Sequence, residues 1–406
     1  MNRVVLTGFG VVSSIGLGSA EFAEGLRAGR SGARPISVFD TSGFEHANGC
    51  QVMGFDPTVW LRNIDPATLG RASQFSAAAA RMAVTDAGLD EKELAGKRGL
   101  VTVGTTNGEP FDLDVLMEPR IAEGVRATAP ATSRWVPPLM LSISIARELR
   151  MSNVSAYTIG TACAAGNYAI GDGFDAVRSG DVEFALCGGA DAMCRKTFAS
   201  FYRLGAIAPQ VCQPFDADRR GILTGEGAGV LVMESLDSAL ARGARIYAEV
   251  LGYGLNCDAY HQVAPNQSSI ERCMRLALDD AGVKPHEVDL VSAHGTGTQA
   301  NDITESRAVR QVYGDKPPRT VSIKSMLGHT MGAASALGSI ACALAITHGF
   351  IPPTINHRVT DPGCEIDCVP NTSVAADLRV VQNNGLAFGG NNASVILGKY
   401  VKEDGR

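Results

Sequence analysis

A cysteine stands between two alanines in the segment GTACAAG, where a β-like run of residues ends and a helix-like run begins. At such a strand-to-helix junction, unpaired backbone N–H groups and the helix dipole favour an anion and so lower the pKa of a thiol. Cys163 is therefore a candidate nucleophile, and the same N–H groups are suited to holding an oxyanion. The alternative is a buried thiol that only packs, which we expect for Cys187, Cys273 and Cys342 on their apolar segments.

Two of the seven histidines occupy small-residue turns directly after apolar, strand-like runs. These are His294 in SAHGTGT and His329 in SIKSMLGHTMGAAS. Each alone is most simply explained as a hydrogen-bonded structural histidine. Because both fall at equivalent strand ends of an internal repeat, we expect them to face the same cleft as Cys163, and the three together favour a catalytic site.

Charged residues accompany both histidines. Lys324 lies five residues before His329 in the short run VSIKS, and Asp302 and Glu305 follow the His294 turn. A lysine among small and apolar residues needs a carboxylate partner. A structural ion pair and a direct catalytic role both remain open for Lys324 at this point.

A weak repeat between the two halves of the chain supplies the elements that position these groups. AAAARMAVTDAGLD and GLVTVGTTNG correspond to CMRLALDDAGVK and VDLVSAHGTGT. SAYTIGTACAAG corresponds to TVSIKSMLGHTMGAAS, and VEFALCGGADAM to NGLAFGGNNASVIL. Strands that alternate with helices at this spacing predict an α/β fold. We expect two similar halves, residues 1–246 with the nucleophile and residues 247–406 with the two histidines, and a site between them.

The composition narrows the classes of function. The 406 residues are 45% hydrophobic and carry a net charge of −6, and the absence of a basic run argues against nucleic acid as a partner. No run of 18 uncharged apolar residues occurs, so we expect no membrane span. Ten scattered cysteines without a secretion signal indicate reduced thiols and a cytoplasmic protein. Cys364 and Cys368 have no second pair beside them, and we expect no metal site.

Several of these segments together resemble the signature motifs of the elongating β-ketoacyl-acyl carrier protein synthases. They are GTACAAG, AHGTGTQAND, KSMLGHTMGAA and AFGGNN, with the opening RVVLTGFGVVSSIG and the segment PFDADRRGILTGEGAG. The motifs follow the family's order along essentially the whole chain. The resemblance implies the thiolase fold, a five-layer αβαβα sandwich of two duplicated halves, and usually a dimer. It agrees with the repeat, which rests on different observations.

The resemblance also implies a mechanism. Cys163 takes an acyl group from its thioester, and a malonyl thioester then loses carbon dioxide and attacks the acyl-cysteine. His294 and His329 donate hydrogen bonds to the enolate. The amides of Cys163 and Phe388 form a second oxyanion hole, and Phe388 also gates the pocket. No cofactor is implied beyond the phosphopantetheine that arrives on the carrier protein.

Further residues have roles only through the resemblance. Thr296 and Thr298 are expected to bind the pantetheine arm. Lys324 and Glu305 are expected to pair near His329, with Asp302 beside them. The carrier protein of this family is acidic, as is this chain, so docking requires local basic residues. The candidates are Arg62, Arg71 and Arg203, with Lys196 less favoured, although a solvated surface charge is the simplest reading of each.

Two departures from the family's usual pattern bear on the substrate. Gly338 stands where relatives often have a glutamate, and the loop TTNGEP at residues 105–110 is more polar than the stretch expected near an acyl pocket. A shorter, unsaturated or functionalised acyl group, as in polyketide or polyene biosynthesis, therefore stands beside a plain fatty acyl chain.

Other functions are also considered. A non-catalytic chain-length factor shares the fold but lacks the nucleophilic cysteine, although this chain is compatible with the active subunit of a heterodimer with such a factor. A degradative thiolase uses a second cysteine in a CxG turn, where this chain has AFGGNN. No local signature of a cysteine hydrolase is present. A homodimer is the expected assembly, with a heterodimer as the alternative.

Overall fold

The computed structural model describes residues 1–127 and 130–402. Ten of its strands form two sets of five that meet at the antiparallel pair of β1 and β10. Outward from this pair, the first half has the order β1 (Val4–Ser13), β9 (Gly227–Ser235), β7 (Phe184–Asp191), β5 (Gly99–Gly104) and β6 (Val154–Ile159). The second half has β10 (Ala248–Cys257), β16 (Asn391–Gly398), β15 (Val380–Leu386), β11 (Leu290–Ser292) and β12 (Arg319–Val321).

The pairing within the two halves is the same. In each half the first two pairings are antiparallel and the last two are parallel. The repeat inferred from the sequence is thus visible as two copies of one strand topology. The expected boundary at residue 246 falls just before β10 begins at Ala248.

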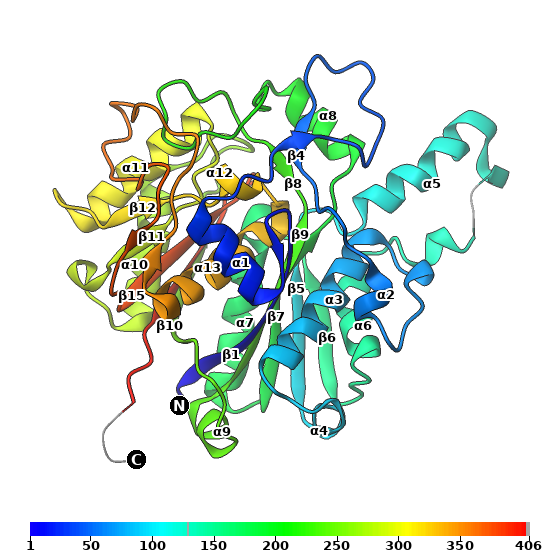
Figure 1. Cartoon of the computed structure of the whole chain (residues 1–406), viewed down its shortest axis with the longest axis horizontal. Helices are drawn as coiled ribbons and strands as arrows, with labels where there is room; N and C mark the ends of the chain where they lie inside the picture. The colour runs from blue at the N-terminus through cyan, green and yellow to red at the C-terminus, as the bar shows by residue number, and fades with distance from the viewer. Residues whose placement is uncertain (128–129, 403–406) are drawn as a thin grey trace.

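Helices complete five layers (Figure 1). One outer layer contains α3 (Arg71–Asp86) and α6 (Met140–Glu148), and the other contains α10 (Gln267–Ala281) and α11 (Gln299–Tyr313). Between the two sets of strands lie α7 (Ala165–Ser179) and α13 (Ala334–His348), which contact both sets and each other. The predicted αβαβα sandwich of the thiolase fold is confirmed.

The middle layer is tightly packed because its helices are rich in glycine and alanine. A Cβ atom on Gly166 would lie 2.5 Å from the backbone nitrogen of Ala336, so only glycine permits this approach of α7 to α13. The segment Met331–His348 is apolar enough to cross a membrane, with a mean hydropathy of 1.4, but 89% of it is buried within the fold. It is therefore a core helix.

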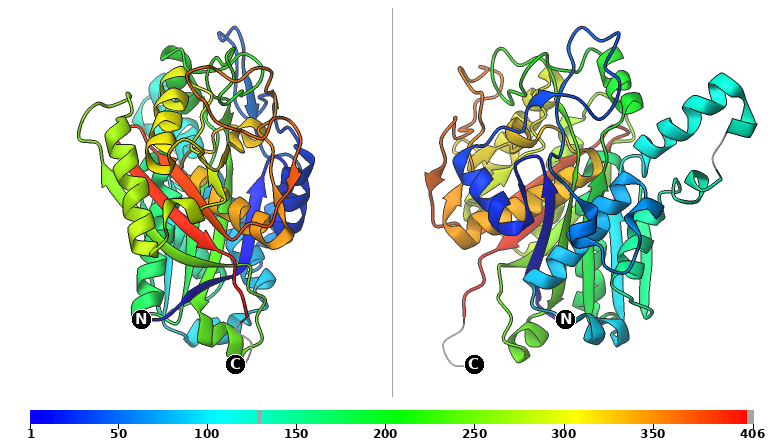
Figure 2. Two further views of the ribbon diagram at one scale, coloured as in Figure 1. Left: turned by 90° about the vertical axis from the view of Figure 1, so that its left-hand side faces the viewer. Right: turned by 45° about the vertical axis from the view of Figure 1, so that its right-hand side comes forward.

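The remaining helices and strands surround this core. They are β2 (Gly16–Leu17), α1 (Gly18–Ala28), β3 (Arg34–Pro35), β4 (Asn48–Cys50), α2 (Pro57–Trp60), α4 (Glu91–Gly96), α5 (Pro110–Glu123), α8 (Arg195–Arg203), β8 (Thr224–Gly225), α9 (Leu236–Ala241), α12 (Lys324–Leu327), β13 (Phe350–Ile351) and β14 (Val374–Ala375). Figure 2 shows α5 extending away from the body of the molecule, on the side of the edge strand β6.

Candidate active site

Cys163 lies in a single 3₁₀ turn, residues Ala162–Ala164, between the end of β6 and the start of α7. The preceding residue, Ala162, has a φ of +50°, a conformation that an alanine rarely adopts. This left-handed residue turns the chain sharply from the strand into the helix. The side chain of Cys163 is thereby held at the start of α7 while remaining 94% buried, since its exposed fraction is 6%.

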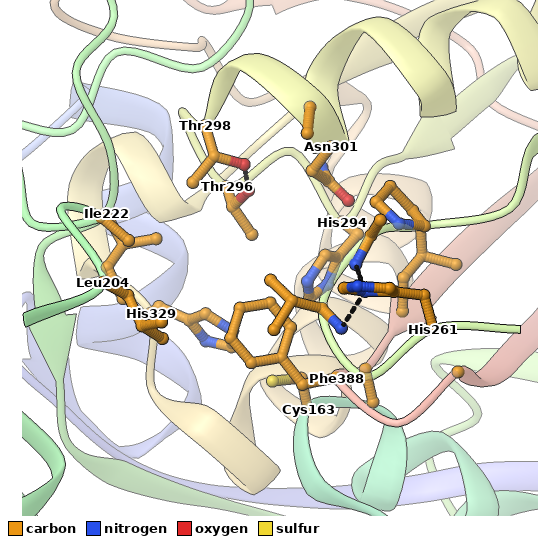
Figure 3. A pocket seen from close by; sticks show the side chains of 18 of the residues that line it. Cys163, Leu204, Ile222, His261, His294, Thr296, Thr298, Asn301, His329 and Phe388 are labelled. Carbon is orange, nitrogen blue, oxygen red and sulfur yellow. Dashed lines mark hydrogen bonds between the residues drawn. The ribbon is translucent and has the colours of Figure 1, made fainter. Parts of the chain in front are cut away.

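The second half of the chain brings both predicted histidines to this cysteine. One potential ligand atom from each of Cys163, His294 and His329 lies within 4.8 Å of the others. The two imidazole rings are nearly perpendicular, at 80°, with centroids 5.3 Å apart. All three side chains line one cavity, and Figure 3 shows them grouped around the ring of Phe388. The sequence prediction that these groups converge is confirmed.

A backbone contact fixes the proton on His329. Its Nδ1 accepts a hydrogen bond from the amide of Met331 at 3.1 Å, so in the neutral ring the proton is on Nε2. Met331 has a φ of +52°, and it precedes α13 as Ala162 precedes α7. The two halves therefore share the same sharp turn into their middle-layer helix.

Lys324 fixes the position of the proton on the His294 ring. Its Nζ donates to the backbone oxygen of His294 at 2.6 Å and lies 3.5 Å from Nδ1 of the same residue. Because the ammonium group can only donate, Nδ1 is the acceptor and Nε2 carries the proton. Burial, followed by the charge of Lys324, lowers the pKa of both histidines well below the ordinary value. Both rings are thus neutral donors at Nε2 near neutral pH.

The expected ion pair between Lys324 and Glu305 is wrong. Within the described chain, Glu305 instead accepts hydrogen bonds from the amides of His294 and Gly295, each at 2.8 Å. Lys324 and Glu305 therefore hold opposite ends of the His294 peptide unit. They interact through their charges: burial lowers the pKa of Lys324, and the charge of Glu305 partly offsets this. A carboxylate that accepts two amides is already satisfied without the lysine.

Asp302 has a similar structural role. It accepts hydrogen bonds from the amides of Phe215 at 2.8 Å and Gly297 at 3.2 Å, and the guanidinium of Arg219 lies 3.5 Å away. Burial raises the pKa of Asp302 to about 6. The carboxylates that follow His294 in sequence thus brace the turn on which the histidine stands.

The thiol of Cys163 differs from the sequence expectation. Burial raises its pKa to about 11, whereas the charge of Lys324 and the amides of Cys163 and Phe388 act in the opposite direction. The expectation of a lowered pKa considered only the helix start, and the closed surroundings of the sulfur outweigh it. The two amides nevertheless flank the sulfur, so they lie beside the carbonyl oxygen that an acyl group on this sulfur would present.

The cavity has a volume of about 190 Å³ and is reached past an aromatic side chain. Phe388 is 42% exposed, packs on Phe201 with ring centroids 5.6 Å apart, and is followed by two glycines with positive φ. Thr296 and Thr298 also line the cavity, and their hydroxyls lie 2.9 Å apart. All three residues thus line the cavity, and the gating role of Phe388 and the binding of pantetheine by the threonines stay predictions.

Of the three arginines predicted for docking, only Arg203 lies beside this cavity. It is exposed at the end of α8, next to the cavity residues Phe201 and Leu204. Arg71 instead binds the buried carboxylate of Glu226 through two nitrogens, at 2.6 and 2.9 Å.

Arg62 lies 4.0 Å from Glu91 at the start of α4, and α4 and α8 lie at opposite ends of the molecule (Figures 1 and 2). Within one chain, Arg62 and Arg71 are therefore not part of the cavity's rim.

Both departures noted in the sequence have structural explanations. Thr105 donates its hydroxyl to the buried carboxylate of Asp191 at 2.9 Å, and Asp191 also accepts the amides of Thr106 and Gly332. The polarity of this loop serves Asp191, and the loop is not among the residues that line the cavity. At Gly338 a Cβ would lie 2.4 Å from the side-chain oxygen of Asn383, which occupies that space.

His261 and Asn301 are among the cavity residues that the sequence did not indicate. His261 follows β10, and its Nδ1 accepts the amides of Val263 and Ala264 at 3.0 and 2.9 Å (Figure 3). Asn301 lies in the first turn of α11. Neither stands in a glycine-rich turn after a strand, which was the signal that singled out His294 and His329.

Comparisons with known proteins agree with this geometry. Residues 1–239 match the model of the "Beta-ketoacyl synthase, N-terminal domain", and residues 247–358 match that of the C-terminal domain. A 3-oxoacyl-[acyl-carrier-protein] synthase 2 from Synechocystis is 37% identical over 98% of both chains. Nodulation protein E of Rhizobium meliloti is 36% identical over 96% of this chain and 98% of its own.

Solved structures are similar over the same length. "The ishigamide ketosynthase/chain length factor" is 63% identical, with a TM-score of 0.97, and 98% of this chain and 100% of that chain are covered. The ketosynthase complex "AntDE:AntF", described as a type II PKS acyl-carrier protein with its ketosynthase bound to the hexaketide, is 31% identical, with a TM-score of 0.89 and the same coverage.

Proposed function

This chain belongs to the β-ketoacyl synthase family, whose members are acyltransferases that condense an acyl group with malonyl-acyl carrier protein, and we propose how its residues divide this reaction. The observation that carries the proposal is the meeting of one thiol and two neutral imidazoles, from different halves, at the end of one cavity. The acyl groups of fatty acid and polyketide biosynthesis are the substrates.

In the first half-reaction, the sulfur of Cys163 attacks the carbonyl carbon of an acyl thioester. The bond from Cys163 to the carbonyl carbon forms, the bond from that carbon to the pantetheine sulfur breaks, and the thiol proton is transferred to the departing sulfur. The negative charge of the tetrahedral intermediate is placed on its oxygen, where the amides of Cys163 and Phe388 donate hydrogen bonds. The acyl group remains on Cys163 as a thioester.

In the second half-reaction, a malonyl thioester occupies the same entrance. Its carbonyl oxygen accepts hydrogen bonds from Nε2 of His294 and His329, and the bond to the carboxylate breaks to release carbon dioxide. The electron pair moves into an enolate whose oxygen the two imidazoles stabilise, each by roughly 3 kcal/mol. The enolate carbon then attacks the acyl-cysteine, and the sulfur leaves as the β-ketoacyl thioester forms.

The test of this assignment is a Cys163→Ser variant given an acyl-carrier protein. We expect the wild-type chain to gain the mass of the acyl group and the variant to gain none, because a neutral hydroxyl has no strong base beside it. Cys364→Ser, at a free cysteine outside the residues that line the cavity, is the matched control. Normal acylation of Cys163→Ser excludes Cys163 as the nucleophile.

The assembly is proposed to be a heterodimer with a chain-length factor. The likeness at 63% identity to a ketosynthase/chain length factor structure supports it. Among the described residues β6 has no strand on its outer side, which leaves this edge open to either kind of partner. The intact cysteine and histidines argue that this chain is the active subunit. Native mass spectrometry after co-expression with a chain-length factor tests this, and a homodimer is the competing result.

The acidic carrier protein is proposed to dock beside Arg203, which the exposed end of α8 presents at the cavity. The cytoplasm is the proposed compartment, because all ten cysteines are unpaired in the described chain and nine of them are buried as thiols.

A further inference from the structure

The cavity contains one polar side chain whose orientation points to a specific contact with the substrate's carrier arm. We propose that the side-chain oxygen of Asn301 accepts a hydrogen bond from an amide N–H of the pantetheine arm. Asn301 is thereby a substrate-positioning residue in addition to Thr296 and Thr298. The inference rests on the proposed function, since it supposes that a pantetheine thioester enters this cavity.

The orientation of Asn301 is fixed by two buried carboxylates. Its Nδ2 lies 3.2 Å from Oδ1 of Asp302 and 3.4 Å from Oε2 of Glu305. A primary amide has two N–H donors, and both are used by these contacts. The reverse rotamer would place the amide oxygen against two carboxylates, which is repulsive. The oxygen is therefore held away from them, and Figure 3 shows it directed toward the side of the cavity where His294 lies.

This oxygen has no donor within the described chain. Asn301 is half-buried and lines the cavity, whereas Thr296 and Thr298 hydrogen-bond to each other. A partly buried acceptor without a partner loses the hydrogen bond that water or a ligand would give it. Because an amide oxygen can only accept, its ligand partner must present a donor.

The chemistry of the ligand supplies this donor. A pantetheine arm is a narrow chain with two amide groups, and it must pass through the entrance of the cavity before its thioester reaches Cys163. Its amide N–H groups are donors of the kind that Asn301 requires, whereas its carbonyl oxygens suit the threonine hydroxyls. A cavity lined by an amide oxygen and by hydroxyl groups can thus bind both the N–H and the carbonyl oxygen of the ligand's amides.

A competing role for Asn301 is purely structural. Through Glu305 the amide is linked to the His294 peptide, so its loss could disturb the histidine rather than the substrate. The two roles differ in one respect. Loss of a structural contact slows the reaction of every thioester at the site. Loss of a substrate contact slows only the thioesters that carry the amide N–H.

The experiment compares two acyl donors on the wild-type chain and Asn301→Ala. One donor is an acyl-pantetheine thioester, and the other carries the same acyl group on propanethiol, which has no amide. The rate of mass gain at Cys163 is measured for each. We expect Asn301→Ala to lose about tenfold with pantetheine, in line with one lost hydrogen bond at a partly buried site, and less than twofold with propanethiol. Asn153→Ala, at an exposed asparagine, is the control.

A second variant distinguishes loss of the acceptor from a structural disturbance of the turn. In Asn301→Asp the new carboxyl lies beside Asp302 and Glu305, so it takes up a proton and keeps a carbonyl acceptor. We expect it to retain the preference for pantetheine. Equal loss on both donors in Asn301→Ala, or no loss on either, overturns the proposal. Absence of any mass gain in the wild-type chain instead refutes the proposed function itself.

Discussion

In the proposed mechanism Cys163 carries out acyl transfer, whereas His294 and His329 support decarboxylation. Decarboxylation can therefore be measured in a variant that cannot transfer the acyl group. Cys163→Gln places an amide where the acyl thioester would lie, and we expect this variant to release carbon dioxide from malonyl-carrier protein without condensing it. The perturbation of interest is His294→Ala in that background. It removes one of two Nε2 donors while leaving His329 and its bond from Met331 in place.

The expected size follows from the geometry. His294 is neutral, buried and fixed by Lys324, so its donor is already aligned before the enolate forms. Removing one such preorganised donor typically costs about 10²- to 10³-fold in rate. In the background with an intact Cys163, acylation should fall by less than about tenfold, because the amides of Cys163 and Phe388 serve that step.

The assay records carbon dioxide release in Cys163→Gln and in Cys163→Gln/His294→Ala, with intact-mass measurement of acylation in the single His294→Ala variant. His286→Ala, at an exposed histidine outside the site, is the control. The reasoning is refuted if acylation is lost as completely as decarboxylation, or if decarboxylation survives the loss of His294.

Three further outcomes are expected. Because burial raises the pKa of Cys163 to about 11, its alkylation by iodoacetamide should rise about tenfold per pH unit from pH 7 to 9, and a plateau below pH 8 would show that the helix start dominates. Arg203→Glu should raise the KM for carrier-bound substrate severalfold, less so at high salt, without affecting a small pantetheine thioester; equal effects on both donors contradict a docking role. Burial raises the pKa of Glu109 to about 8 from 4.5, so the folded state keeps a proton that the unfolded state has released, and stability should fall as pH rises between these values. Urea denaturation at pH 5 and pH 8 checks this, and Glu109→Gln should flatten the dependence; an unchanged dependence in Glu109→Gln would assign it to another group.

The fold and the catalytic trio were predictable from the sequence because they depend on local patterns. Strand ends followed by small residues mark Cys163, His294 and His329, and the duplication places these ends together. The symmetry is visible in the paired left-handed residues Ala162 and Met331, which the sequence did not indicate, because neither is a glycine.

The partners of charged groups were not predictable, because they depend on which atoms the finished fold brings within reach. Glu305 follows the His294 turn in the sequence and was expected to pair with Lys324. Its carboxylate instead accepts hydrogen bonds from two backbone amides. Arg71 was predicted as a docking residue, but its guanidinium binds the carboxylate of Glu226, 155 residues away in the sequence. The pKa of Cys163 likewise depends on the cover of the site, which a local motif does not contain.

The docked pair of α7 and α13 has a consequence for how the chain is made. All five strands of the first half are complete at Ser235, but the apolar face of α7 is covered by α13, which begins about 100 residues later at Ala334. A growing chain therefore exposes hydrophobic surface while the remaining part is synthesised, and a fragment ending at residue 246 should be prone to aggregate. Since the thiol and the imidazoles belong to different halves, a growing chain that ends before His329 lacks part of the catalytic trio. The condensation therefore requires that α13 has been synthesised and has packed against α7.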